Sequence, residues 1–212
     1  MTDLVFYRDS WEIQPPKCFR VLYPGAIWRL PDKEKTVYLT FDDGPAKEVT
    51  PAVIDILNEF NAKATFFCVG NNVKKNPLIY QRLVKEGMKT GNHTFSHTKA
   101  FDNTVQKYLK DVDKCSYYVE SDLFRPPHGQ LYPWHLPALK KRFKNIIMWD
   151  VLSKDYDNKL TADGVAHNVI KNVREGSIVV FHDSVKAWPR LKEALPKILK
   201  YLTDNNYKTE LL

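Results

Sequence analysis

The sequence predicts a mainly parallel α/β fold in one domain. From about residue 36, segments with strand composition alternate with segments whose apolar residues recur at helical spacing, which is typical of a parallel sheet connected by helices. No repeat, low-complexity run or linker interrupts this alternation. The 212 residues, 43% hydrophobic and 13% aromatic, are enough to bury a sizeable core. We expect residues 1–35 to be an irregular N-terminal extension packed on a main domain of residues 36–212.

The individual elements follow from local composition and periodicity. The first strand is expected at residues 36–41, "TVYLTF", and the next at residues 64–69, "ATFFCV". Between them, an apolar stripe at helical spacing follows Thr50 and Pro51, which are typical of the start of a helix. The later elements are expected to be a helix at 77–87, a short strand leading into Gly91, a helix at 103–119, a strand at 122–124, a helix at 134–143, a strand at 145–151, a helix at 161–173, a strand at 177–182, a helix at 188–203 and a last strand near 208–212.

The basic excess of the chain is spread along its length. Lys and Arg number 32 and Asp and Glu 25, for a formal net charge of +7. A positive balance suits an acidic polymer, but the lysines form no polybasic run with interleaved aromatic residues, so we expect no nucleic-acid partner. Cys18, Cys68 and Cys115 are odd in number and far apart, which fits neither a disulfide framework nor a thiolate zinc site. We expect free thiols.

The N-terminal residues carry no secretory signal. They contain an early Asp3 and only the four-residue apolar run "LVFY", without a basic start. No apolar stretch reaches the length needed to cross a bilayer, so we expect no membrane span. We therefore expect a cytoplasmic protein as the sequence stands, or an exported one if the chain is a trimmed form. The sequence leaves the oligomeric state unknown, and we favour a monomer.

Polar residues interrupt the apolar pattern at five points, and each point directly follows a predicted strand. The segments are, in order, "DDGP", "GNHTFSH", "RPPHG", "SKDYD" and "HD". In parallel α/β sheets and barrels, the carboxyl ends of the strands share one face, where active sites are built. The five segments are therefore predicted to form one site.

The types and spacing of these polar residues predict a metal site. His93 and His97 are four residues apart, so on one helical turn they would face the same way and hold one ion. The "HExxH" glutamate that metalloproteases use as a base is missing. Asp42 and Asp43 could supply one carboxylate ligand and leave the other free to accept a proton. Taken alone, "TFDDGP" is more typical of an acidic turn and a lone His pair is often incidental, so the prediction depends on their combination.

Five ordered segments carry a family resemblance. "TFDDGP", "HTFSH", "FRPPHG", "WDVLSKDYD" and "IVVFHD" resemble the five motifs of the polysaccharide deacetylases, the NodB-like group of carbohydrate esterase family 4, over about two thirds of the chain. The resemblance implies a distorted (β/α) barrel with about seven parallel strands, with residues 36–212 as its catalytic domain. It further implies a metal-dependent hydrolase that removes N-acetyl groups from an acetylated glycan of the chitooligosaccharide or peptidoglycan type.

The metal ligands are implied residue by residue. By resemblance, Asp43 joins His93 and His97 on a divalent ion, most commonly zinc, with Co, Ni or Mn as other candidates. This choice agrees with the donor types, because two imidazoles and one carboxylate leave open positions for water and substrate.

The proton-transfer groups are implied in the same way. Asp42 resembles the general base of the family, and Arg125 resembles the arginine that orients this base. His182 resembles the general acid, and Asp155 the carboxylate that orients it and keeps it protonated. The backbone N–H of His128 stands where the family helps to bind the oxyanion. These roles suit amide hydrolysis, in which a water must lose a proton and the leaving amine must gain one.

Departures from the family motifs concern the substrate. His128 replaces a usual Tyr, Leu152 an Asp, Tyr156 a Trp and Val180 a Leu. We predict that His128, Tyr156, Val180 and Pro127 contact the substrate. Two alternatives stay open: an O-acetyl-glycan esterase on the same scaffold, because only the leaving group differs, and a glycan-binding pseudo-enzyme, because of these departures.

Other aromatic and titratable residues are interpreted as structural. Asp183 is expected to orient the loop after His182, and His135 and His167 are expected to be exposed or to cap helices. Four tryptophans are interpreted as packing residues rather than sugar platforms, although any of them near the cleft could stack on a pyranose ring: Trp11, Trp28, Trp134 and Trp188.

Overall fold

Short parallel strands form the framework of the molecule. The computed structural model describes residues 10–31 and 34–212. The strands in this part of the chain are β1 (Ala26–Ile27), β2 (Thr36–Asp42), β3 (Ala64–Cys68), β4 (Lys89–Asn92), β5 (Leu123–Phe124), β6 (Asn145–Ile147), β7 (Val151–Leu152), β8 (Ile178–His182) and β9 (Lys208–Thr209). Their order is β1-β6-β5-β4-β3-β2-β8-β7, with every neighbouring pair parallel, and β9 pairs with the start of β2.

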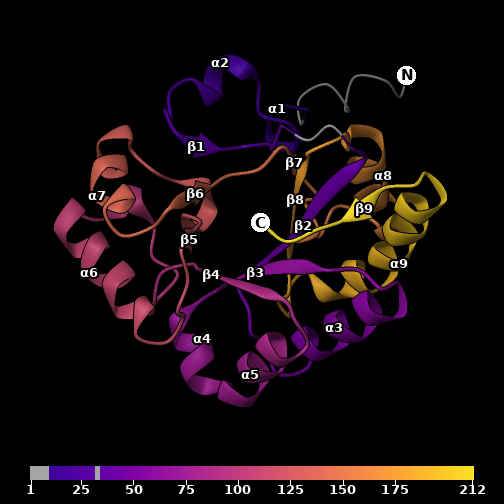
Figure 1. Cartoon of the computed structure of the whole chain (residues 1–212), viewed down its shortest axis with the longest axis horizontal. Helices are drawn as coiled ribbons and strands as arrows, with labels where there is room; N and C mark the ends of the chain where they lie inside the picture. Colours follow the sequence, from indigo (N-terminus) through magenta and orange to yellow (C-terminus); the bar gives the residue numbers. More distant parts are fainter. Residues whose placement is uncertain (1–9, 32–33) are drawn as a thin grey trace.

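Helices surround this sheet on its outer side (Figure 1). The predicted distorted (β/α) barrel is confirmed, with eight strands on the main path of the described sheet rather than about seven. The helices are α1 (Ser10–Ile13), α2 (Lys17–Arg20), α3 (Val49–Glu59), α4 (Gly70–Lys75), α5 (Pro77–Lys85), α6 (Val105–Ser116), α7 (Leu136–Lys140), α8 (Ala162–Asn172) and α9 (Trp188–Asp204), with 3₁₀ turns η1 (Ala100–Asp102), η2 (Pro127–Gly129) and η3 (Pro133–His135).

The observed elements differ from the predicted ones in several details. Helix α4 was not predicted, because its segment "GNNVKK" carries almost no apolar periodicity. Helix α3 begins at Val49, so Thr50 lies in its first turn, where its Oγ1 accepts a hydrogen bond from the Ala46 N–H (2.7 Å). The N-terminal extension, expected to be irregular, contains α1 and α2 and adds β1 to the sheet. The apolar run at residues 4–7 lies outside the described residues.

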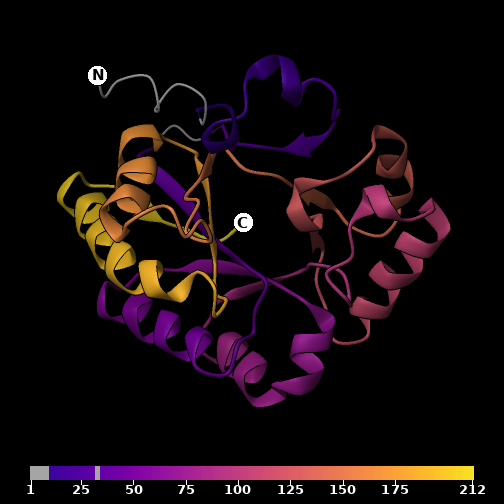
Figure 2. The same ribbon diagram turned by 180° about the vertical axis from the view of Figure 1, so that it is seen from behind.

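The segment 145–151 was predicted as one strand, and this prediction was wrong. It forms two strands, β6 and β7, which belong to opposite ends of the sheet. Residues 148–150 join them across the seam of the barrel, where the Met148 N–H donates to the Ile27 carbonyl (2.8 Å) and the Asp150 N–H to the Ile178 carbonyl (2.9 Å). A continuous apolar run cannot reveal that its two halves pair with different neighbours. Figure 2 shows the N-terminal segment lying over this seam.

Asp150 ties the N-terminal segment to the seam. Its buried carboxylate accepts hydrogen bonds from Arg20 (2.7 Å), Arg174 (2.8 and 3.0 Å) and the Ser177 hydroxyl (2.8 Å). These charge-assisted bonds hold its pKa below the ordinary value, although burial alone would raise it. The N-terminal segment is thus held to the barrel by ion pairs around the buried carboxylate of Asp150.

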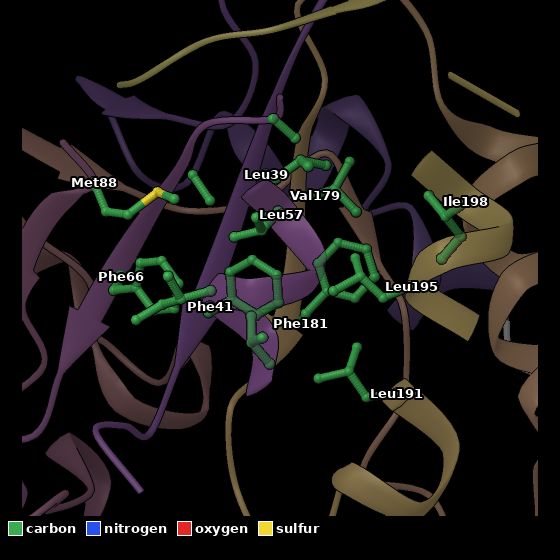
Figure 3. Close-up of a cluster of buried hydrophobic side chains, with 14 of the residues drawn as sticks. Leu39, Phe41, Leu57, Phe66, Met88, Val179, Phe181, Leu191, Leu195 and Ile198 are labelled. Atoms are coloured by element: carbon green, nitrogen blue, oxygen red, sulfur yellow. The ribbon is translucent and has the colours of Figure 1, made fainter. Parts of the chain in front are cut away.

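Alternate residues of the central strands face different sides of the sheet. Leu39 and Phe41 of β2 pack outward, where Phe41 stacks on Phe66 (4.9 Å between ring centroids) and on Phe181 (5.3 Å) under the helices (Figure 3). Thr40 and Asp42 therefore face the inside of the barrel, because successive side chains of a strand point to opposite faces. The period of two is what aims Asp42 into the interior.

Two further expectations concern the thiols and the membrane. Cys68 and Cys115 are buried and Cys18 is exposed, and all three are free thiols, as expected. Within residues 10–31 and 34–212, every helix is too short or too polar to cross a bilayer.

Candidate active site

The polar segments that follow the strands converge on one cleft of about 630 Å³ at the carboxyl ends of the strands. The predicted residues that line it are Asp42, Asp43, His93, His97, Arg125, His128, Tyr156, Val180 and His182. Asp155 lies behind His182 and is completely buried. The convergence predicted from the order of strands and polar segments is therefore observed.

Asp42 is held from below by Arg125. The Arg125 Nη1 donates to Asp42 Oδ1 and to Thr40 Oγ1, both at 2.7 Å, and Nη2 donates to the Met148 carbonyl (3.0 Å). The guanidinium is buried and lies over the ring of Phe67, 4.1 Å from its centroid. Thr40 and Asp42 share the inner face of β2, so one arginine reaches both. Removal from water lowers the pKa of Arg125, and the charge of Asp42 opposes that shift.

Asp43 faces the same cleft because the backbone turns at this residue. Strand alternation alone would send its side chain to the opposite face from Asp42. Asp43 instead adopts a φ of 80°, a left-handed conformation that Asp tolerates better than most residues. Asp183 anchors this turn, since its carboxylate accepts the Gly44 N–H (3.1 Å) and the Thr50 hydroxyl. Asp183 was expected to orient the loop after His182, and in the structure its side chain holds the loop after β2.

His93 and His97 do not lie on one helical turn, contrary to the prediction. They occupy a loop after β4 in which Thr94 (φ 62°) and His97 (φ 56°) both have left-handed backbones. Asp111 of α6 fixes the loop, because its carboxylate accepts the N–H groups of Phe95 (2.8 Å) and Ser96 (2.9 Å). The spacing of four brings the imidazoles together through this loop, with ring centroids 5.2 Å apart.

Asp43, His93 and His97 form a set of donors that fits a divalent metal ion. Their donor atoms all lie within 4.8 Å of one another, and Asp43 Oδ1 is 3.0 Å from His97 Nε2 and 3.8 Å from His93 Nε2. His93 Nδ1 is 2.8 Å from the Arg125 carbonyl, so Nδ1–H donates there and leaves the Nε2 lone pair for an ion. Among the described residues, these three make up the cluster with metal-ligand geometry.

The protonation of this cluster suits metal binding. Burial lowers the pKa of His93 to about 4, so its imidazole is neutral near pH 7. Burial would raise the pKa of Asp43, but the hydrogen bond with His97 and the nearby charge of His182 bring it well below its usual range. An anionic carboxylate beside a neutral imidazole is the form in which these groups bind a metal.

His182 is paired with Asp155. In the parallel ladder His182 lies in register with Asp42, so both side chains stand on the inner face of neighbouring strands. His182 Nδ1 is 2.7 Å from Asp155 Oδ1, and the His182 backbone N–H donates to Asp155 Oδ2 (2.8 Å). Burial opposes protonation, but the charge and hydrogen bond of Asp155 outweigh it and raise the pKa of His182 to about 9.

Three of the four predicted substrate contacts line the cleft. Tyr156 stands edge-on to His182 with ring centroids 5.0 Å apart, and Val180 lies on the inner face of β8. His128 has a φ of 59° and places its ring 4.6 Å from that of His97. Pro127 is buried and does not line the cleft, whereas its neighbour Pro126 does. In a Pro-Pro pair, sequence alone does not indicate which ring faces the open side.

Several cleft residues were not predicted, among them Trp149, Glu12, Ser184 and Lys186. Trp149 lies at the seam between β6 and β7, and its ring packs so closely on Gly129 that a Cβ there would lie 2.4 Å from it. Glu12 reaches the cleft from α1; its carbonyl accepts the Trp149 indole N–H (3.3 Å), and its carboxylate pairs with Lys154 (2.9 Å). Trp149 is the first residue of the fourth segment, "WDVLSKDYD", which was a usable signal, whereas no local signal marks Glu12.

His135 is a further correction. It was expected to be exposed or to cap a helix; it stands at the N-cap position of α7, but its side chain makes no capping hydrogen bond and is buried. The imidazole packs edge-on against Tyr108, with ring centroids 5.3 Å apart, and removal from water lowers its pKa. Tyr108 of α6 is distant in sequence, so periodicity in the segment of His135 could not reveal this contact.

Known proteins resemble this chain in sequence and in structure. The family model described as polysaccharide deacetylase matches residues 29–142. A peptidoglycan-N-acetylglucosamine deacetylase of Bacillus cereus is 33% identical over 188 residues, which cover 85% of this chain and 88% of that protein. A chitooligosaccharide deacetylase of Azorhizobium caulinodans is 32% identical over 166 residues, which cover 75% and 79%.

The fold comparison agrees with the sequence comparison. The crystal structure of the Bc1960 peptidoglycan N-acetylglucosamine deacetylase in complex with 4-naphthalen-1-yl-N-oxidanyl-benzamide matches with a TM-score of 0.85 and 30% identity, over 93% of this chain and 94% of that one. Deacetylases of this kind depend on a metal ion, and the donor cluster of Asp43, His93 and His97 fits one. The chain therefore belongs to the polysaccharide deacetylases, the NodB-like hydrolases of carbohydrate esterase family 4.

Proposed function

We propose that this chain is a metal-dependent deacetylase that removes N-acetyl groups from an acetylated glycan of the chitooligosaccharide or peptidoglycan type. The proposal rests on one observation, the grouping of two hydrogen-bonded pairs, Asp42 with Arg125 and His182 with Asp155, around one donor cluster. The names of the relatives, peptidoglycan and chitooligosaccharide deacetylases, support the class of substrate.

Asp42 is the proposed general base. It lines the cleft, and Arg125 engages its Oδ1, so Oδ2 remains to take a proton from the attacking water. Arg125 is a positioning residue in this scheme, because its further bonds to Thr40 and the Met148 carbonyl prevent it from moving with the carboxylate. A carboxylate held this firmly needs little reorganisation during proton transfer.

His182 is the proposed general acid. Asp155 engages Nδ1, so Nε2 carries the proton that the leaving amine needs. With its pKa raised to about 9, the imidazole is protonated at neutral pH and can donate. The amine of an amide is a poor leaving group unless its nitrogen is protonated. This donor therefore matters more for an N-acetyl substrate than for an activated ester.

The donor cluster and the third motif complete the proposed site. Asp43, His93 and His97 would hold a divalent ion, with zinc the first candidate and Co, Ni or Mn the alternatives. When bound, such an ion supplies Lewis-acid polarisation of the acetyl carbonyl. The backbone N–H of His128 is proposed to donate to the acetyl oxygen as negative charge develops there.

The walls of the cleft fit an acetylated sugar. Trp149, Leu152, Tyr156 and Val180 line it with apolar surface. An acetyl methyl group and the face of a pyranose ring both present C–H groups that pack on such walls. Leu152, where the family usually has Asp, makes this wall more apolar and is proposed to affect the choice of glycan rather than the reaction.

A release assay tests the proposal. The protein is stripped with a chelator, reloaded with zinc or cobalt, and assayed for acetate released from N-acetylated chitooligosaccharides, peptidoglycan fragments and O-acetylated xylan. We expect acetate from an N-acetylated substrate, and only after reloading. Acetate from xylan alone would favour the O-acetyl esterase, and glycan binding without any acetate from the loaded protein would favour the pseudo-enzyme.

A further inference from the structure

Three aromatic side chains form an exposed stack outside the cleft. The ring of Tyr132 lies 4.3 Å from that of Trp134, nearly parallel at 11°, and 4.4 Å from that of Phe101, tilted by 37°. Trp134 remains 62% exposed and Phe101 45% exposed. We name Phe101, Tyr132 and Trp134 the aromatic cluster. Large aromatic rings usually fill interiors, so rings that stack on each other at the surface indicate a binding role.

The aromatic cluster is held in place from below and from the side. Buried His135 lies nearly parallel to Tyr132, with ring centroids 5.8 Å apart and an angle of 14°, and it packs against Tyr108 of α6. In the loop that carries Phe101, the Asn103 side-chain amide donates to Thr98 Oγ1 and to the Lys99 carbonyl, both at 2.8 Å. The rings are therefore pre-organised, which reduces the entropy that a ligand must offset on binding.

The aromatic cluster continues the wall of the cleft outward. The loops after β4 and β5 touch at His97 and His128, whose rings are 4.6 Å apart and line the cleft. The same two loops touch again at Phe101 and Tyr132. Phe101 follows His97 by four residues, so its Cα lies at most about 14 Å from that of His97. A ligand of a few connected sugar rings can reach from the donor cluster to this point.

We propose that the aromatic cluster is a remote subsite that stacks a pyranose ring of the glycan chain whose acetylated residue occupies the cleft. The proposal rests on the proposed function and adds a contact outside the five motifs. The exposed ring of Trp134 offers the stacking face, Tyr132 supports it from behind, and exposed Lys99 and Asp102 provide hydrogen-bonding groups for hydroxyls beside Phe101.

The small size of the aromatic cluster favours a sugar over a protein partner. Its two exposed rings can bury about 150–250 Å² each at most. A standard protein interface buries about 800 Å² on each partner, so these rings fall well short of a dimer contact. A pyranose needs one flat apolar face with polar groups around it, and the aromatic cluster has that form.

Chain-length dependence provides the test. The kcat and KM of the zinc-loaded protein are measured on the dimer and the hexamer of N-acetylglucosamine, for the wild type, Trp134→Ala and Trp134→Phe. Tyr117→Ala is the matched control, because Tyr117 is 86% exposed at the carboxyl end of α6 and does not line the cleft. We expect Trp134→Ala to raise KM for the hexamer by about 3- to 10-fold, while KM for the dimer and kcat for both substrates stay unchanged. Trp134→Phe should keep most of the affinity and Tyr117→Ala all of it.

Direct binding separates this inference from the proposed function. Calorimetric titration of the hexamer into metal-free wild type and Trp134→Ala requires no catalysis. A weaker Kd in the variant supports the subsite even if no acetate is released, whereas release of acetate with equal Kd and KM in both proteins overturns the subsite and leaves the function intact. The subsite is also overturned if the wild type does not bind the hexamer, or if the wild-type protein is a homodimer that Trp134→Ala dissociates. Circular dichroism checks that the variant is folded.

Discussion

Two pairs of side chains in the cleft each join a carboxylate to a nitrogen base, but the group that faces the cleft differs between them. At the end of β2, a carboxylate faces the cleft and a cation lies behind it, with Asp42 in front of Arg125. At the end of β8, an imidazole faces the cleft and a carboxylate lies behind it, with His182 in front of Asp155. In the proposed mechanism the residue in front decides the chemistry, because the first pair would present a proton acceptor and the second a proton donor. Adjacent parallel strands in register are enough to place the two side by side.

Exchanging the acceptor should have the largest effect. Asp42→Asn keeps the shape of the side chain but cannot accept a proton, so we expect kcat to fall by about 10²- to 10⁴-fold without rescue by added metal. Asp43→Asn is the matched control, since it removes the same charge from the next residue. That variant should instead bind zinc more weakly and recover part of its activity in excess zinc. Steady-state kinetics and zinc titration of both variants test these expectations. Near-full activity of Asp42→Asn would contradict the role of Asp42 as general base.

Removing the cation behind the acceptor should affect stability as well as the position of Asp42. Arg125→Met leaves Asp42 buried and unpaired, which we expect to lower the free energy of unfolding by about 3–5 kcal/mol. Asp155→Asn should cost less, because its amide can still accept a hydrogen bond from His182, which is partly exposed. Urea denaturation of the two variants beside the wild type measures the difference. Equal losses of unfolding free energy in the two variants would show that burial does not make the Asp42–Arg125 pair more important for stability than the His182–Asp155 pair.

Removing the donor should separate two substrates. His182→Ala lacks the proton for the leaving amine, so we expect cleavage of the N-acetyl substrate to slow by about 10²-fold or more. An activated aryl acetate has a leaving group that needs little protonation, so its hydrolysis should slow by less than about tenfold. Zinc content, measured in parallel, should stay at the wild-type level. Comparable losses on both substrates would remove His182 from the donor role.

The smallest expected effect is a pH dependence of stability in the metal-free protein. The pKa of His182 is raised from 6.5 to about 9, so its contribution is complete below pH 6.5 and is lost as the pH rises through about 9. Between pH 7 and pH 9 this amounts to about 2 kcal/mol of unfolding free energy. Urea denaturation across this range should show the decline in the wild type and a flatter profile in Asp155→Asn. Parallel declines in both proteins would assign the effect to other groups.

Several features of the site followed from the sequence because they depend on local rules. The alternation of strands and helices predicts parallel strands, and the carboxyl ends of parallel strands must share one face, which brings distant polar segments together. The period of two in β2 determines that Asp42 and Thr40 face the same side, so one arginine can bind both. These relations hold wherever parallel strands pair, so they can be predicted without knowing which other segments pack against the strands.

Other features were decided only by the tertiary structure, because they depend on which distant groups meet. The left-handed backbone of the loop from His93 to His97 is held by Asp111 of α6, so the spacing of the histidines predicted their proximity but not their conformation. Segment 145–151 divides at the seam because its two halves pair with different strands. Glu12 enters the cleft because Asp150 binds Arg20 and so holds the N-terminal segment across that seam. Strands of two or three residues and contacts between distant segments leave no periodic signal, so these features could not be predicted from local sequence.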